Sequence, residues 1–138
     1  MGTYSKIRIN IPVWAAWLFV IISVGLVPWT IYLSAALPEH HLSRNWDITW
    51  VGFDAFLIIS LLATGILAKM KSIYMIMAAA ITGTLFLTDV WFDILSYKTG
   101  STGFDKAIIM AVFGEIPVAV MSFGLTIHGL RRLHSGNK

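Results

Sequence analysis

Four acidic side chains stand within stretches of sequence that are otherwise apolar enough for a membrane interior. Asp89 and Asp93 are four residues apart in the segment FLTDVWFDILS, so a helix places both carboxyl groups on one face. Asp54 and Glu115 stand in two other apolar stretches. An ionised Asp at the centre of a membrane helix costs about 2.5–3.5 kcal/mol on insertion scales. We therefore expect the four groups to face a shared polar interior instead of lipid.

Carboxyl groups in a low-dielectric interior cannot all be ionised and unpaired. They can hold protons, bind a cation, or pair with basic groups, for which the candidates are Arg44, Lys98, Lys106, His40 and His41. Aromatic rings beside carboxylates suit an organic cation, although an aromatic belt at the membrane interface also explains Trp50. The predicted ligand- or cation-binding residues are Asp54, Asp89, Asp93, Glu115, Trp50 and Trp91.

A bound divalent metal ion is a narrower alternative to a proton or an organic cation. In that case a divalent cation would be the cofactor. Carboxylates at positions i and i+4 can share a hard cation. The metal ligands would then be Asp89, Asp93 and Glu115, with His40 and His41 from the neighbouring polar connection. Such a site fits an enzyme that acts on lipid head groups. Basic residues that would hold a phosphate are sparse at this depth, so the sequence favours a protein that is not an enzyme.

The composition indicates a protein that folds in lipid. Of the 138 residues, 57% are hydrophobic and only 12% are charged, whereas soluble domains carry about a quarter charged residues. Cysteine is absent from the sequence, which excludes disulfides, thiolate metal sites and thiol nucleophiles. The net charge is +3, but the basic residues stand at the ends of apolar segments and not in one patch. This distribution predicts orientation in a membrane and no binding to nucleic acid.

Apolar runs predict four membrane-crossing helices, each near or above the ~20 residues that a bilayer requires. Their expected bounds are 12–37, 48–68, 72–97 and 105–130. The first run is longer than the 7–15 residues of a signal-peptide core, so we expect it to remain as a span. The sequence thus predicts an all-α fold: one membrane domain over residues 1–138, built as a bundle of four transmembrane helices.

Lysine and arginine are unevenly divided between the two sides of this bundle. Seven stand on one side, namely Lys6, Arg8, Lys69, Lys71, Arg131, Arg132 and Lys138, and three on the other, namely Arg44, Lys98 and Lys106. Because the richer side normally faces the cytoplasm, we expect both termini to be cytoplasmic. The predicted location is the plasma membrane, which the chain crosses several times.

The same topology places the four acids at similar depths. With a rise of 1.5 Å per residue, Asp93 lies about 7 Å, Asp54 about 10 Å, and Asp89 and Glu115 about 14 Å from the outer ends of their helices. A functional site is the usual explanation for such acids, and a structural hydrogen-bonded pair is the alternative for the deepest two. Interior polar stripes are also expected, with Ser23 and Thr30 on the first span, Thr82 on the third, and Ser122 and Thr126 on the fourth. Small residues expected to permit close helix packing are Gly52, Gly65, Gly83, Gly114 and Gly124.

Three short segments, WVGFD (50–54), TDVWFDI (88–94) and GEIPVA (114–119), carry a resemblance. Together they resemble a family of small, uncharacterised four-span membrane proteins of Gram-positive bacteria, in which the second segment reads D-A-W-F-D-V and the third E-L-P-L-A. Val90 stands where that pattern has alanine. The resemblance covers about half of the chain and includes all four intramembrane acids. It implies a four-span fold and a bacterial origin, and it implies no activity.

These observations favour a small membrane protein with an outward-facing acidic site that binds a cation, a proton or a cationic small molecule. A role in transport would require a homo-oligomer or a partner membrane protein, because four spans alone rarely enclose a pathway. An accessory or pH-sensing membrane subunit is the first alternative. A lipid-modifying enzyme that depends on a divalent metal ion is the second.

Overall fold

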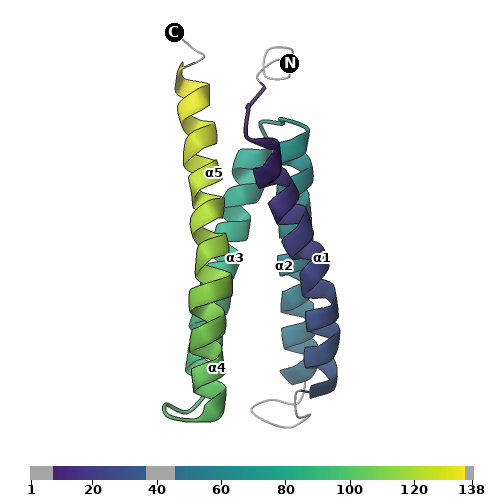
Figure 1. Cartoon of the computed structure of the whole chain (residues 1–138), viewed down its shortest axis with the longest axis vertical. Coiled ribbons are helices and arrows are strands. Elements are labelled where there is room, and N and C mark those ends of the chain that lie inside the picture. The colour runs from purple at the N-terminus through teal and green to yellow at the C-terminus, as the bar shows by residue number, and fades with distance from the viewer. Residues whose placement is uncertain (1–7, 37–45, 136–138) are drawn as a thin grey trace.

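The computed structural model describes residues 8–36 and 46–135, and the prediction of an all-α fold is confirmed. Six elements follow one another, and no strand occurs in either described range. They are α1 (Val13–Ala36), α2 (Trp46–Lys69), α3 (Met75–Ser96), α4 (Thr102–Met110), the π-helical segment η2 (Ala111–Glu115) and α5 (Ile116–Ser135). Because α4, η2 and α5 follow one another without interruption, the chain forms four long helical rods (Figure 1).

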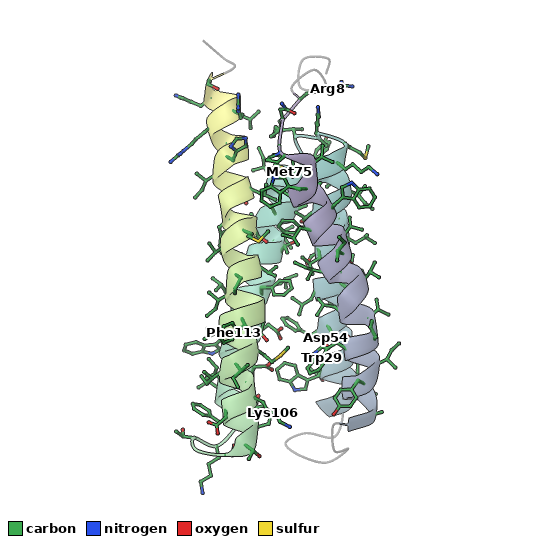
Figure 2. All side chains as sticks on the ribbon, in the orientation of Figure 1. Arg8, Trp29, Asp54, Met75, Lys106 and Phe113 are labelled. Carbon is green, nitrogen blue, oxygen red and sulfur yellow. The ribbon has the colours of Figure 1, made fainter. Side chains whose placement is uncertain are left out.

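All four rods are long and apolar enough to cross a membrane, so the chain is a multi-pass membrane protein. The fourth is a 34-residue rod over 102–135, and it extends beyond the expected bounds of 105–130 at both ends. It begins early because the Ser101 side chain accepts a hydrogen bond from the Phe104 N–H at 3.2 Å and so caps the helix. Large apolar side chains cover the outside of the bundle, as a lipid environment requires (Figure 2).

The rods form two antiparallel hairpins that are joined along one seam. α1 packs against α2, α3 packs against α5, and α2 packs against α3. Residues 8–12, the α2–α3 turn and the end of α5 lie together at the top of Figure 1, and the α3–α4 turn lies at the bottom. We call the top the basic end, because it carries Arg8, Lys69, Lys71, Arg131 and Arg132. We call the lower half the acidic half, because Asp54, Asp89, Asp93 and Glu115 lie there.

A tight turn closes the basic end. Lys71 has φ 55°, in the left-handed region. Its N–H donates to the carbonyl of Ala68 at 3.0 Å, and the Ser72 N–H donates to the carbonyl of Leu67 at 2.9 Å. This pair of bonds is the Schellman pattern that ends many helices. The Lys71 carbonyl in turn accepts a bond from the Ile9 N–H at 3.1 Å, which fixes the segment before α1 against the turn.

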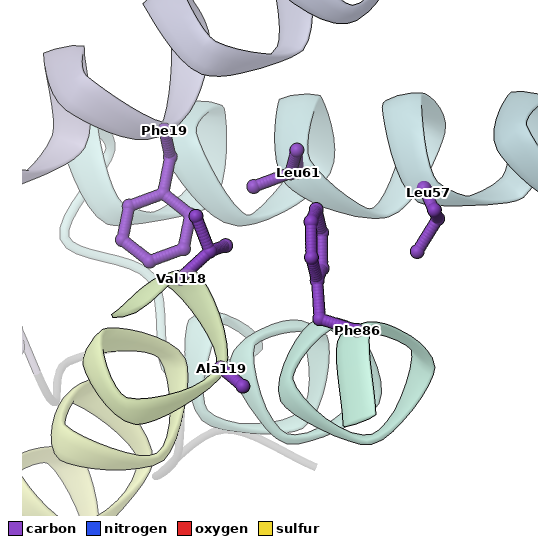
Figure 3. Packing of buried hydrophobic residues seen from close by; sticks show 6 residues of the cluster. All are labelled: Phe19, Leu57, Leu61, Phe86, Val118 and Ala119. Carbon is purple, nitrogen blue, oxygen red and sulfur yellow. The ribbon is translucent and has the colours of Figure 1, made fainter. Parts of the chain in front are cut away.

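Two clusters of buried apolar side chains hold the hairpins together. Figure 3 shows the larger cluster, in which Phe19 of α1 lies beside Val118 of α5, and Phe86 of α3 lies against α2. Its buried members are Phe19, Leu57, Leu61, Phe86, Val118 and Ala119. The second cluster, at the basic end, consists of Ile9, Ile11, Ala16, Ala68 and Met75. The larger cluster occupies the middle of the bundle, where Leu57, Phe86 and Val118 each stand three residues from an acid.

Two of the five expected small-residue contacts exist, and three do not. A Cβ atom on Gly65 would lie 2.7 Å from Val20 Cγ2 and 3.0 Å from the Ala16 carbonyl oxygen, and one on Gly83 would lie 3.0 Å from the Phe123 ring. The same atom at Gly52, Gly114 or Gly124 would meet nothing within 4 Å, so the prediction was wrong for these three. The reason is geometric: the helices are close only where they cross, and the spacing of glycines does not fix the crossing point.

Most buried hydroxyl groups have a partner, and the expected polar stripes face the interior. The Thr82 hydroxyl donates to the Ala78 carbonyl at 2.9 Å, so the Thr64 hydroxyl is the donor in the 2.9 Å bond between the two threonines. The Ser23 hydroxyl donates to the Ile58 carbonyl at 3.1 Å and links α1 to α2. Among the buried polar residues are Ser23, Thr30, Thr64, Thr82 and Ser122.

Candidate functional site

The four intramembrane acids lie in the acidic half of the bundle, on three of its rods. Asp54 is on α2, Asp89 and Asp93 are on α3, and Glu115 is the last residue of η2. Asp89 and Glu115 are buried, with 8% and 7% of their surface exposed. Asp54 and Asp93 are half-buried. The two acids expected to lie deepest are therefore the two most enclosed.

The four carboxyl groups are near enough that their charged forms would repel one another. Asp89 interacts with Asp93, Glu115 and Asp54, and both Asp93 and Glu115 interact with Asp54. Figure 2 shows Asp54 at the same level of the bundle as Phe113, two residues before Glu115 and on the opposite hairpin. The group of four is called the acidic cluster below.

The acidic cluster has no basic partner within residues 8–36 and 46–135. Lys98 and Lys106, which were candidates for ion pairs, are both exposed. In Figure 2 Lys106 lies nearer the bottom of the bundle than Asp54 does. The other candidates, Arg44, His40 and His41, lie outside the described residues. Within the described residues, none of the four carboxyl groups is thus paired with a basic side chain.

Asp54 has one neutral partner. The Thr30 hydroxyl of α1 donates to Asp54 Oδ2 at 3.2 Å. Thr30 is buried, with 8% of its surface exposed. This contact brings the first rod into the site, which sequence reasoning did not include. The signal was present, because Thr30 shares the interior stripe of its helix with Ser23, seven residues earlier.

Glu115 stands at a local departure from α-helical geometry. The Ile116 N–H donates to the Ala111 carbonyl, five residues back, so the turn over Ala111–Glu115 is wider than an α-helical turn. Pro117 follows directly and has no N–H to offer the carbonyl of Phe113. Glu115 Oε2 is buried and has no hydrogen-bond partner within residues 8–36 and 46–135. An oxygen in that position is costly unless something else satisfies it.

The two predicted aromatic residues occupy different environments. Trp50 is half-buried, and its ring meets that of Phe92 on α3 edge to face, with centroids 6.5 Å apart. Trp50 precedes Asp54 by four residues and so shares its face of α2. Trp91 is 65% exposed. It is two residues from both Asp89 and Asp93, which turns it to the other side of the helix. Phe92, which was not predicted, is the aromatic neighbour of Trp50.

The predicted metal ligands do not form a metal site in the described part of the chain. There, no three His, Asp or Glu side chains lie where they could hold one ion. Asp89, Asp93 and Glu115 are near enough to repel one another, yet they do not form a set of ligands for a divalent cation. His40 and His41 lie outside the described residues. Comparison with protein-family models, curated proteins and solved structures finds no match to this chain.

Proposed function

We propose that the acidic cluster binds protons or a small organic cation and that the protein takes part in transport across the membrane. The supporting observation is the buried, unpartnered oxygen of Glu115, in a cluster whose carboxyl groups repel one another. A positive ligand between these groups removes the repulsion and supplies the missing partner. Without such a ligand, the cluster carries an uncompensated cost in a medium of low dielectric constant.

An organic cation suits the surroundings of the cluster better than a divalent metal ion does. The described residues offer no set of three metal ligands. They do offer the paired rings of Trp50 and Phe92 beside Asp54 and Asp93. Aromatic faces and carboxylates together bind ammonium-type cations, with about 0.5–2 kcal/mol from each cation–π contact.

The uneven distribution of lysine and arginine supports an orientation for the site. In the plasma membrane of a bacterium, the basic end and both termini would face the cytoplasm. The acidic half would then open toward the outside of the cell. A homo-oligomer or a partner membrane protein would complete the pathway, because four spans alone rarely enclose one.

Binding of a lipophilic cation to the purified protein tests this proposal. Tetraphenylphosphonium is the probe, and its affinity is measured by isothermal titration in detergent. We expect Glu115→Gln and Asp89→Asn each to weaken binding at least about tenfold, because attraction between opposite charges about 4 Å apart contributes roughly 4 kcal/mol at an effective dielectric constant of about 20. Affinity should also fall at low pH, because protons compete with the cation for the same oxygens.

Asp105→Asn is the matched control. It removes the same charge from an exposed position in the first turn of α4, outside the cluster, and should leave the affinity unchanged. Circular dichroism confirms that each variant is folded. Equal affinity of Glu115→Gln, Asp89→Asn and the unaltered protein would refute the proposal. Loss of pH-driven uptake by the same two variants in proteoliposomes would extend the result from binding to transport.

A further inference from the structure

An apolar groove lies between α1 and α5 toward the basic end. Its volume is about 290 Å3. On the α1 side, Trp14, Ala15 and Phe19 line it, and on the α5 side Met121, Gly124 and His128. Its wall is apolar except at His128, whose Nε2 lies 3.2 Å from the Asn10 carbonyl oxygen. The groove is therefore apolar along its length and polar at one end.

Gly124 leaves room in the middle of this groove. A Cβ atom there would meet nothing within 4 Å. Because α1 and α5 are bridged in the described structure by side chains such as Phe19 and Val118 and not by close backbone packing, nothing from α1 fills the space. An extended apolar chain would fit against this strip of α5.

The face of α5 that lines the groove continues into positive charge. One stripe of this helix carries residues spaced by four, three and four positions, namely Gly124, His128, Arg131 and Ser135. A second hollow is lined by Leu130, Arg131, His134 and Ser135. Neither α1 nor α5 contains an Asp or Glu. The groove thus ends beside basic side chains with no acidic residue on either helix.

We propose that the groove and this hollow bind one anionic phospholipid. An acyl chain would lie along Phe19 and Gly124, and the head group, with its net negative charge, would lie between Arg131 and His134. The charge distribution favours this ligand, because a phospholipid is also apolar along its length and charged at one end. A parallel second copy of the chain fits less well, because it would bring its own Arg131 and Arg132 to the same basic rim.

Native mass spectrometry of the detergent-purified protein tests the proposal, with phosphatidylglycerol and phosphatidylcholine of identical acyl chains as the probes. We expect one phosphatidylglycerol per chain, bound at least about fivefold more tightly than phosphatidylcholine, because one basic group near an anionic lipid contributes about 1 kcal/mol. Arg131→Gln combined with His134→Gln should remove this preference. Lys106→Gln, which removes a charge in the acidic half, should retain it.

A second pair of variants tests the groove itself. Gly124→Leu fills it and should reduce retention of both lipids at least about fivefold. Gly25→Leu is the control, because Gly25 also has nothing within 4 Å and does not line the groove. Equal binding of the two lipids by the unaltered protein, or full retention by Gly124→Leu, would overturn the proposal. A dimer that lipid disperses and that Gly124→Leu abolishes would also overturn it, by assigning the groove to a second copy.

Discussion

The basic end and the acidic half of the bundle are built on different principles. Toward the basic end, helices approach closely at Gly65, and the interior hydroxyls of Thr64 and Thr82 bond to each other. In the acidic half, Gly52 and Gly114 face open space, and Glu115 Oε2 has no hydrogen-bond partner among the described residues. At these positions, the part toward the basic end packs closely and pairs its interior hydroxyls, whereas the acidic half leaves open space and a buried oxygen without a described partner. This difference assigns stability to the first part and the proposed cation binding to the second.

The two parts differ most in the space around their glycines, and the largest effect on stability is expected there. Gly65→Ala places a methyl group against Val20 and the Ala16 carbonyl. We expect a loss of about 1–3 kcal/mol in the free energy of unfolding, typical of overpacking. Chemical denaturation in detergent micelles, followed by circular dichroism, measures it.

Gly52→Ala is the matched change in the acidic half of the same helix. It meets no neighbour, so the better helix propensity of alanine should stabilise the protein by up to about 1 kcal/mol. Equal effects of the two substitutions would show that the two parts are packed alike and would remove the basis of the comparison.

Removing an interior polar group should change the free energy of unfolding in opposite directions in the two parts. Thr64→Val removes the donor of the bond to Thr82 and should destabilise the protein by about 1–2 kcal/mol. Glu115→Met removes an oxygen that has no partner and should leave stability unchanged or raise it by about 1–2 kcal/mol. Unfolding measured without added cation provides both values. A large destabilisation by Glu115→Met would mean that the carboxyl group is structural.

The two turns are expected to give the smallest effects. Lys71→Gly relieves a non-glycine residue at φ 55° and should stabilise the basic end by about 0.5–1 kcal/mol. Gly100→Ala introduces the same kind of strain at φ 80° in the α3–α4 turn and should destabilise the protein by about 1 kcal/mol. Midpoints of thermal unfolding measure both shifts. Midpoints that move in the same direction would contradict this interpretation.

Much of the architecture follows from local rules that the sequence obeys. Long apolar runs predicted the four rods, and helical periodicity placed Ser23, Thr82 and Ser122 in the interior. The rise per residue placed Asp89 and Glu115 deepest, and these are the most buried acids. Periodicity should also have separated Trp91 from the predicted site, because a residue two positions from both aspartates cannot share their face, and Trp91 is exposed.

Other features depend on contacts between helices, which periodicity does not specify. Whether Gly65 or Gly124 meets a neighbour depends on where two rods cross. The bond from Thr30 to Asp54 depends on the vertical register between α1 and α2. The early start of the fourth rod does not depend on a contact between helices. The sequence analysis placed this start too late, although Ser101 is a recognisable cap residue at its N-terminus.

The wide turn of η2 also determines which way the chain faces beyond it. Three buried residues stand at intervals of four along this rod, namely Ala107, Ala111 and Glu115. In a regular α-helix, two steps of four residues wind about 80° around the axis, which would carry the third side chain toward the flank of the rod. The π-helical turn contains one more residue than an α-helical turn and so rotates less per residue. Glu115 therefore stays on the side of the rod that carries the two alanines. Removing one residue from 111–114 would rotate Glu115 out of this row, with no change in its chemistry.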